Sequence, residues 1–259
     1  MTRAWRRDHY VTGGGAGKIA LVALAQVKLP DPLPVSRGKH GMPDDGDGAT
    51  AVALAARDRA EDPAWFAEQV IHPFLDLIGN DLGEAAAATA LVAEHAYVIE
   101  AQLHDPDDLG HVQAAWALAK CVCEEGATLV IDVYAARAYL GAEIVQLSPD
   151  RGFDVMNEIT LFFDEQADGS LAAWSLGMCK FGRSDLVRLG LRAGDPEVAA
   201  DAAALLRDVA TTLAAGERVE PGDAIETPDG VALVARAFDP ALAPGVGVDG
   251  PAIVLELSS

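Results

Sequence analysis

The densest group of chemically active side chains in this sequence lies in residues 177–186, which read GMCKFGRSDL. Lys180, Arg183 and Asp185 place two cations and a carboxylate within six residues. Side chains of this kind bind an anionic or carboxylate group when they face a common pocket. We therefore take Lys180, Arg183 and Asp185 as the candidate residues for binding a ligand or a partner.

A structural interpretation of the same stretch competes with this one, and we favour it. Gly177 and Gly182 allow the backbone to turn tightly, and Phe181 is suited to a core position. In this interpretation the stretch is the bulged end of a strand, and its cations neutralise an otherwise acidic chain. Gly177, Phe181 and Gly182 would then set the shape of the segment.

Three further motifs suggest chemistry, but each lacks a defining part. Residues 13–18 (GGGAGK) have one residue too few between the glycines for a phosphate-binding loop and are not followed by Ser or Thr. Residues 104–111 hold two histidines and three aspartates at a predicted helix start, where aspartate commonly caps free N–H groups. Residues 44–48 (DDGDG) lack the length and the final glutamate of a calcium-binding loop. We expect no metal ion and no cofactor.

The three cysteines, Cys121, Cys123 and Cys179, form neither a redox motif nor a zinc-binding spacing. We expect structural thiols of the kind found buried in cytosolic proteins. Cys179 has no local signature of a catalytic thiol, and the chain has no Gly-x-Ser-x-Gly elbow. Because a fold can bring distant residues together, nucleophilic catalysis stays open, but the sequence assigns no catalytic residue.

Charge and hydropathy narrow the class of protein. The 259 residues include 40 Asp and Glu against 19 Lys and Arg, a formal net charge of −21. Nucleic-acid binding is not expected, because it depends on clustered cations. No clear apolar run exceeds residues 19–25, well short of the roughly 20 residues that cross a membrane. We predict a cytoplasmic protein that does not enter a membrane.

The first 25 residues have two interpretations. Arg6 and Arg7 ahead of the apolar residues 19–25 imitate an export signal. Against this, a glycine-rich stretch separates them, and the apolar residues alternate as far as Leu29 with the period of a strand. We favour a flexible basic leader over residues 1–17 followed by a strand, and leave open whether residues 1–25 act as an export signal.

Hydrophobic periodicity and helix caps place these motifs on strands and helices. Asp62-Pro63 and Asp195-Pro196 each combine an N-cap with proline at the first helical position, and Pro73 should kink or split the first of these helices. Strands are predicted over residues 18–29, 95–104, 128–134, 158–165, 171–176 and 253–257, with two short ones around residues 228–230. Helices are predicted over residues 62–78, 82–93, 107–126 and 195–216, a long loop over 30–48, and a strand or helix over 51–57.

This order predicts an α+β fold with a mixed, largely antiparallel sheet and helices packed on it. Residues 95–134 form a β-α-β unit, and Asp168-Gly169 suits a hairpin turn. A ferredoxin-like duplication is an alternative organisation. The predicted domain organisation is the leader 1–17, an α+β domain over 18–216, and a small C-terminal β extension of the same domain over 217–259.

Residues 175–186 resemble the Thr/Ser-x-Gly-Met/Leu-x-x-Phe-Gly-x-x-Asp/Glu-Leu motif of an uncharacterised bacterial α+β family, a domain of unknown function. Ser175 stands at the position where threonine is expected, and Cys179 and Lys180 occupy variable positions. The strand that begins at His95, its following helix and residues 18–30 fit the same layout, so the similarity extends over most of the chain. The resemblance implies a structural motif and assigns no catalytic residue.

These observations favour an acidic, cytoplasmic, non-catalytic protein that binds another protein, in the manner of an immunity protein or an adaptor. The expected partner is basic, because complementary charge accelerates association. One alternative is an enzyme or small-ligand receptor with an anion pocket at Lys180 and Arg183. Another is a structural subunit that acts only through assembly. The sequence leaves enzymatic activity open but favours a non-catalytic protein. It does not predict the oligomeric state.

Overall fold

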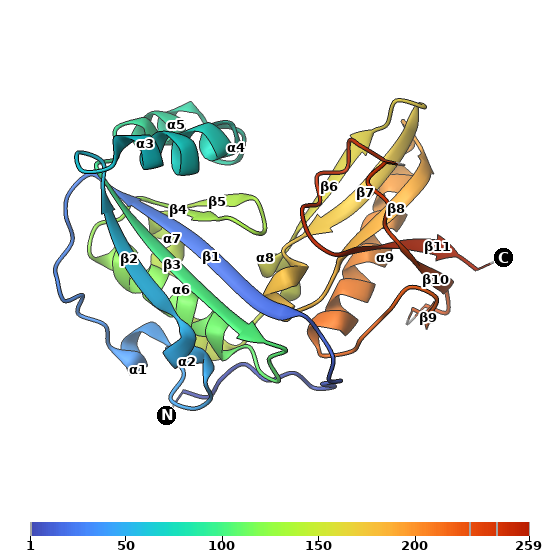
Figure 1. The fold of residues 1–259 in the computed structure, drawn as a ribbon, viewed down its shortest axis with the longest axis horizontal. Coiled ribbons are helices and arrows are strands. Elements are labelled where there is room, and N and C mark those ends of the chain that lie inside the picture. The colour runs from blue at the N-terminus through green and yellow to red at the C-terminus, as the bar shows by residue number, and fades with distance from the viewer. Residues whose placement is uncertain (1, 228, 242, 259) are drawn as a thin grey trace. The chain divides into compact units, whose positions relative to one another are not determined.

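The computed structural model of the chain describes residues 2–227, 229–241 and 243–258, and of Ala49 the backbone only. The chain forms two compact units, each with its own sheet (Figure 1). Unit 1 comprises Met1–Arg6, Lys18–Leu103 and Asp108–Phe153. Unit 2 comprises Arg7–Gly17, His104–Asp107 and Asp154–Ser259.

Unit 1 is built on a five-stranded sheet in the order β2-β3-β1-β4-β5 (Figure 1). Strand β2 pairs with β3, β1 with β4, and β4 with β5, all antiparallel. The central strand β1 is rich in aliphatic residues because both of its faces are covered. The strands are β1 (Ala16–Ala25), β2 (Ala53–Asp58), β3 (His95–His104), β4 (Leu129–Asp132) and β5 (Arg137–Leu140).

Helices cover both faces of this sheet (Figure 1). On one face, Leu24 and Ile131 pack with Phe66, Val70 and Ile78 of the first helical group. That group contains α3 (Pro63–Phe66), a π-helical turn (Ala67–Ile71), α4 (His72–Leu82) and α5 (Glu84–Leu91). The helical run continues without a break from Pro63 to Leu82, and the π-helical turn just before Pro73 is its local irregularity near the predicted kink or split.

The helix α6 (Gly110–Glu124) lies on the other face (Figure 1). Its Trp116 makes an edge-to-face contact with Tyr139 of β5, with ring centroids 5.5 Å apart. Tyr139 points away from its neighbour Ala138, which belongs to the core of the first face. Shorter helical segments complete the unit: α1 (Arg37–His40), α2 (Gly48–Ala51), α7 (Gly141–Val145) and a 3-10 turn (Pro149–Arg151).

Part of the strand order in unit 1 matches the ferredoxin-like organisation that the sequence offered as an alternative. Strands β2, β3, β1 and β4 follow the order of a ferredoxin-like sheet, and β5 extends its edge. The helices α3 to α5 are inserted between β2 and β3, where that fold has a short hairpin connection. The predicted β-α-β order at residues 95–134 is confirmed, although β1 lies between its two strands.

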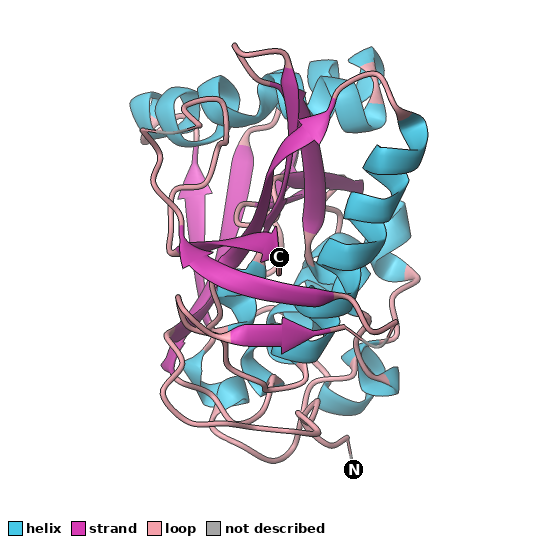
Figure 2. Ribbon diagram, turned by 90° about the vertical axis from the view of Figure 1, so that its right-hand side faces the viewer, coloured by secondary structure: helices cyan, strands magenta, loops and turns pink. Residues whose placement is uncertain are grey.

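Unit 2 is built on a six-stranded sheet in the order β6-β7-β8-β11-β10-β9 (Figure 2, strands in magenta). The predicted hairpin is confirmed as the antiparallel pair β6 and β7. Strand β8 pairs in parallel with β11, which comes from the far end of the chain. The strands are β6 (Thr160–Glu165), β7 (Ser170–Leu176), β8 (Asp185–Arg192), β9 (Ala224–Glu226), β10 (Ala232–Ala237) and β11 (Ala252–Leu257).

The long helix α9 (Pro196–Ala214) packs against β7 and β8. As predicted, Asp195 is its N-cap, and its side chain accepts hydrogen bonds from the backbone N–H groups of Glu197 and Val198. A second apolar core contains Trp174, Val187 and Val254 together with Ala243 and Val246 of the loop before β11. Two short segments complete the unit: α8 (Val155–Glu158) and the 3-10 turn η3 (Met178–Phe181).

The fold is therefore α+β with largely antiparallel strands, as predicted, but it contains two sheets where the sequence indicated one. A change of unit falls between Gly17 and Lys18 and none falls at residue 216, and each unit collects segments from distant parts of the chain. Residues 1–17, predicted as a flexible leader, contribute the buried side chains Trp5 and Arg7. Strands β5 and β8 were missed.

Within the described residues, no helix combines the length and the apolar character needed to span a lipid bilayer.

Candidate functional site

The motif at residues 175–186 forms a closed connection between β7 and β8. The carboxylate of Asp185 accepts hydrogen bonds from Ser175 Oγ at 3.1 Å and from the backbone N–H of Met178 at 3.2 Å. The same Ser175 Oγ accepts from the backbone N–H of Leu186 at 2.9 Å. A hydroxyl at position 175 and a carboxylate at position 185 therefore hold the two strand ends together. Threonine, the other residue of the motif at 175, carries the same hydroxyl.

The two glycines of the motif lie at the two ends of the turn η3. Gly177 at its N-terminus and Gly182 at its C-terminus have φ angles of 112° and 62°, a region that other residues rarely adopt. Gly182 also lies close to residues 13–17, since an added Cβ would stand 2.6 Å from the carbonyl oxygen of Gly15. Phe181 and Met178 are fully buried between the strand ends. The predicted structural roles of Gly177, Phe181 and Gly182 are thus consistent with their geometry.

Lys180 is not presented to solvent. Its side chain is 0% exposed, and Nζ donates to Glu158 Oε2 of α8 at 3.0 Å. Glu158 is itself buried. Since a buried ion pair is tolerated only when both charges are compensated, this pair ties α8 to η3 and leaves the ammonium committed to an internal contact.

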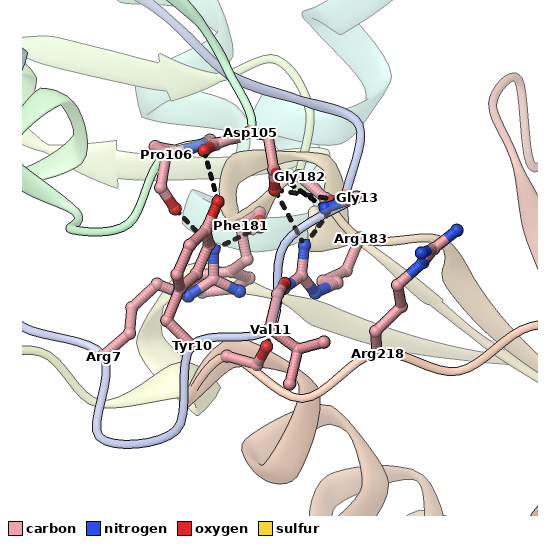
Figure 3. A network of polar contacts seen from close by, with 12 residues as sticks. Arg7, Tyr10, Val11, Gly13, Asp105, Pro106, Phe181, Gly182, Arg183 and Arg218 are labelled. Carbon is pink, nitrogen blue, oxygen red and sulfur yellow. Dashed lines mark hydrogen bonds and ion pairs between the residues drawn. The ribbon is translucent and has the colours of Figure 1, made fainter.

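Arg183 is likewise directed inward (Figure 3). Its Nε donates to the carbonyl of Glu217 at 2.7 Å, and Nη2 donates to the carbonyls of Gly216 and Val11 at 2.7 and 3.2 Å. Its Nη1 lies 3.6 Å from the carboxylate of Asp105. Backbone carbonyls thus surround the guanidinium, whose planar set of donors matches several acceptors at once.

Asp105 joins this arginine to the glycine-rich segment (Figure 3). Its carboxylate accepts from the backbone N–H groups of Gly13 and Gly14 at 2.7 and 3.0 Å. Burial opposes ionisation of Asp105, but these bonds and the charge of Arg183 outweigh it and hold its pKa below the ordinary value. The glycine-rich segment is therefore an anion-binding loop for a carboxylate of its own chain.

A second buried arginine, Arg7, lies next to this network and was assigned to the leader by the sequence. Its Nε and Nη2 donate to the carbonyls of Ala214 and Leu213 at 3.1 and 3.0 Å, which are the last carbonyls of α9. Its Nη1 donates to the carbonyls of Pro106 and Phe181. Burial and the nearby Arg183 lower the pKa of Arg7 to about 10. Arg7 thus caps the C-terminal end of α9, where a cation is favoured.

The four cations that cluster in the sequence at residues 180–192 have separate environments. Lys180 pairs with Glu158, and Arg183 with Asp105. Arg192 is exposed and pairs with Asp195, while Arg188 lines a cavity beside α9. Asp185 faces Ser175 rather than either cation. Lys180, Arg183 and Asp185 therefore lie close in sequence, but their polar groups are engaged by internal partners, and the geometry favours a structural role for them.

The remaining motifs also act within the fold. Asp108 accepts from the backbone N–H of Gly110 and so starts α6, as expected. No group of three His, Cys, Asp or Glu side chains suited to a metal occurs among the residues described. Cys121 and Cys123 are buried free thiols, as predicted, and burial raises their pKa values to about 11 and 12. Cys179 is half-buried.

Sequence reasoning missed Arg7, Asp105 and Glu158 as partners of this network. Their roles had no sequence signal, because Arg7 and Arg183 bond mainly to backbone carbonyls, which every residue has. Asp105 adopts a φ of 42°, which is uncommon for any residue except glycine, asparagine and aspartate. The sequence alone does not indicate this backbone angle.

We expect Arg183→Lys to lower the free energy of unfolding. A lysine ammonium cannot reach the four backbone carbonyls that Arg183 bonds and the Asp105 carboxylate together, and each buried group left unpaired costs roughly 1–3 kcal/mol. Urea denaturation followed by circular dichroism measures the change. The matched control is the exposed Arg236→Lys, which should stay within about 0.5 kcal/mol of the wild type. Equally small effects of both substitutions would contradict the structural role.

The buried carboxyl of Asp185 should make stability depend on pH. Burial raises its pKa to about 7, so the native state keeps a proton that the unfolded chain loses above its lower carboxyl pKa. The contribution of Asp185 therefore falls as pH rises towards 7. Asp185→Asn has no proton to lose, so its stability relative to the wild type should rise by up to about 1.4 kcal/mol per pH unit between about pH 5 and 7, then level off. Urea titrations across this range test it; a difference independent of pH refutes it.

Comparison of the chain with protein-family models, with curated proteins and with solved structures found no match. The resemblance to the uncharacterised family therefore stays a prediction from the sequence. The structure gives the motif at residues 175–186 a physical meaning, since its hydroxyl, its two glycines, its phenylalanine and its carboxylate together close the connection between β7 and β8.

Proposed function

We propose that the protein is a non-catalytic, acidic binding protein whose unit 2 recognises a basic protein partner. The observation that carries the proposal is the distribution of charge between interior and surface. Of the eight Lys and Arg residues in unit 2, Arg7, Lys180 and Arg183 are buried and Arg188 is half-buried. Unit 2 therefore exposes four arginines against fifteen carboxylates.

The exposed arginines are further neutralised at the surface. Arg192 pairs with Asp195, Arg218 with Glu220, and Arg236 with Glu256. Each pair engages one cation and one carboxylate, so the net charge is unchanged, but few exposed cations of unit 2 remain unpaired. A surface of this kind steers a cationic partner towards it and repels anionic molecules.

The edge strand β6 is the part of this surface that we propose as the contact. Its outer edge has no neighbouring strand in the sheet, and Phe163 on it is 39% exposed. Asp164, Glu165 and Asp168 are exposed beside it, and residues 152–179 contain no Lys or Arg. An exposed aromatic side chain surrounded by carboxylates suits a basic partner that also offers an apolar anchor.

A cavity at the same end of the hairpin supports this choice. It has a volume of about 390 Å³ and is lined by Glu165, Gln166, Asp168 and Ser170 together with apolar residues that include Leu189 and Pro244. Hydrogen bonds from the hydroxyl and the N–H of Ser170 lower the pKa of Asp168 and keep it ionised. Two carboxylates above an apolar base suit the charged end and aliphatic stem of a lysine or arginine.

A charge-neutral hairpin tests this proposal. The variant Asp164→Asn, Glu165→Gln, Asp168→Asn should lose a partner that the wild type recovers from a soluble extract of the source cells at low salt and releases at high salt. Quantitative mass spectrometry of the recovered proteins measures the loss.

The matched control removes three carboxylates at the opposite edge of the sheet, as Glu220→Gln, Asp223→Asn, Glu226→Gln. It should recover the partner as the wild type does. Equal loss of the partner from both variants would mean that binding depends on net charge alone, which contradicts a contact at the hairpin. The absence of any salt-sensitive partner would also contradict the proposal.

A further inference from the structure

A second cavity in unit 2, distinct from the hairpin end, lies between β8 and α9. Its volume is about 520 Å³, within the range of about 300–1,000 Å³ that is common for small-molecule sites. Strand β8 and helix α9 form its walls, and the turn after β9 and the end of β11 complete it. The α9 wall presents Val198, Asp201, Leu205 and Asp208, whose spacing puts them on one face of the helix.

Arg188 on the β8 wall differs from the other shielded cations of unit 2. Its Nη1 donates to the carbonyl of Leu255, but its Nε is buried with no hydrogen-bond partner, and no described carboxylate forms an ion pair with it. Arg7 and Arg183, by contrast, are surrounded by acceptors. Burial lowers the pKa of Arg188, and the charge of Glu256 offsets this only in part, so an anionic group in the cavity that Arg188 lines would compensate its charge further.

The α9 wall carries the opposite charge. Neither Asp201 nor Asp208 forms an ion pair with a described residue, and both line the cavity. A simple anion would bind Arg188 but would be repelled by these carboxylates. A simple cation would bind these carboxylates but would be repelled by Arg188. Aliphatic side chains, including Val198, Leu205 and the 62% exposed Leu257, lie between the charged groups.

We propose that this cavity binds a small zwitterion with an aliphatic body, such as an aliphatic α-amino acid. Arg188 holds the carboxylate, Asp201 and Asp208 hold the ammonium group, and Val198, Leu205 and Leu257 contact the aliphatic part. Arg192 at the cavity is already paired with Asp195, so Arg188 is the carboxylate anchor. The site is independent of the partner surface on β6.

Three related compounds separate the contributions of the two charges. Leucine carries both groups, 4-methylpentanoate keeps the carboxylate alone, and 3-methylbutylamine keeps the ammonium alone. Isothermal titration calorimetry on the wild-type protein should show binding of leucine and at least tenfold weaker binding of either single-charge analogue. Equal affinity for leucine and one analogue, or no binding of leucine, overturns the proposal.

Two variants and one control locate the site. Arg188→Met and Asp208→Asn should each weaken leucine binding tenfold or more. Arg207→Met changes an exposed arginine of the same helix that does not line the cavity, and it should leave the affinity unchanged. If leucine binds Arg188→Met and the wild type equally, the assignment is wrong. Should Arg188→Met fail to fold, the analogue series on the wild type and the Asp208→Asn variant still decide the question.

Discussion

The carboxylate of Asp105 is the contact on which the interior of unit 2 depends. It bonds the backbone N–H groups of Gly13 and Gly14 on one side and faces Arg183 on the other. Arg183 and Arg7 then bond the backbone carbonyls at the end of α9. The charge of this one carboxylate thus partly balances the charges of two buried arginines, and the dipoles of the backbone carbonyls balance the rest. Three segments that are distant in sequence are joined by this arrangement.

Burying these cations has an electrostatic consequence for the outside of the unit. Lys180 and Arg183, which look like part of a basic cluster in the sequence, are removed from the surface, so the exposed residues of unit 2 include few cations. The contacts that close the β7–β8 connection thus also keep Lys180 and Arg183 out of the acidic surface that we propose as the partner contact. Arg188 forms no ion pair with a described carboxylate and lines a cavity, and on these two observations we base the proposed ligand site.

Local signals made a large part of the fold predictable. The cap at Asp195, the turn at Asp168 and the irregularity just before Pro73 each depend on neighbouring residues, so they appear where the sequence places them. The parallel pairing of β8 with β11 and the division into two sheets depend on contacts between distant segments. The structural reading of Gly177 and Gly182 followed from type and spacing. The inward direction of Lys180 and Arg183 did not, because it is set by Glu158 and by backbone carbonyls.

The most direct test of this account follows the arginine side chains themselves. In protein with ¹⁵N-labelled arginine, NMR hydrogen exchange reports each Nε–H group separately. The Nε–H groups of the buried Arg7 and Arg183 donate to backbone carbonyls, so they should exchange much more slowly with solvent than that of the exposed Arg207. If Arg7 and Arg183 exchange as fast as Arg207, their guanidinium groups are open to solvent, and the internal role assigned to the cations of unit 2 is wrong.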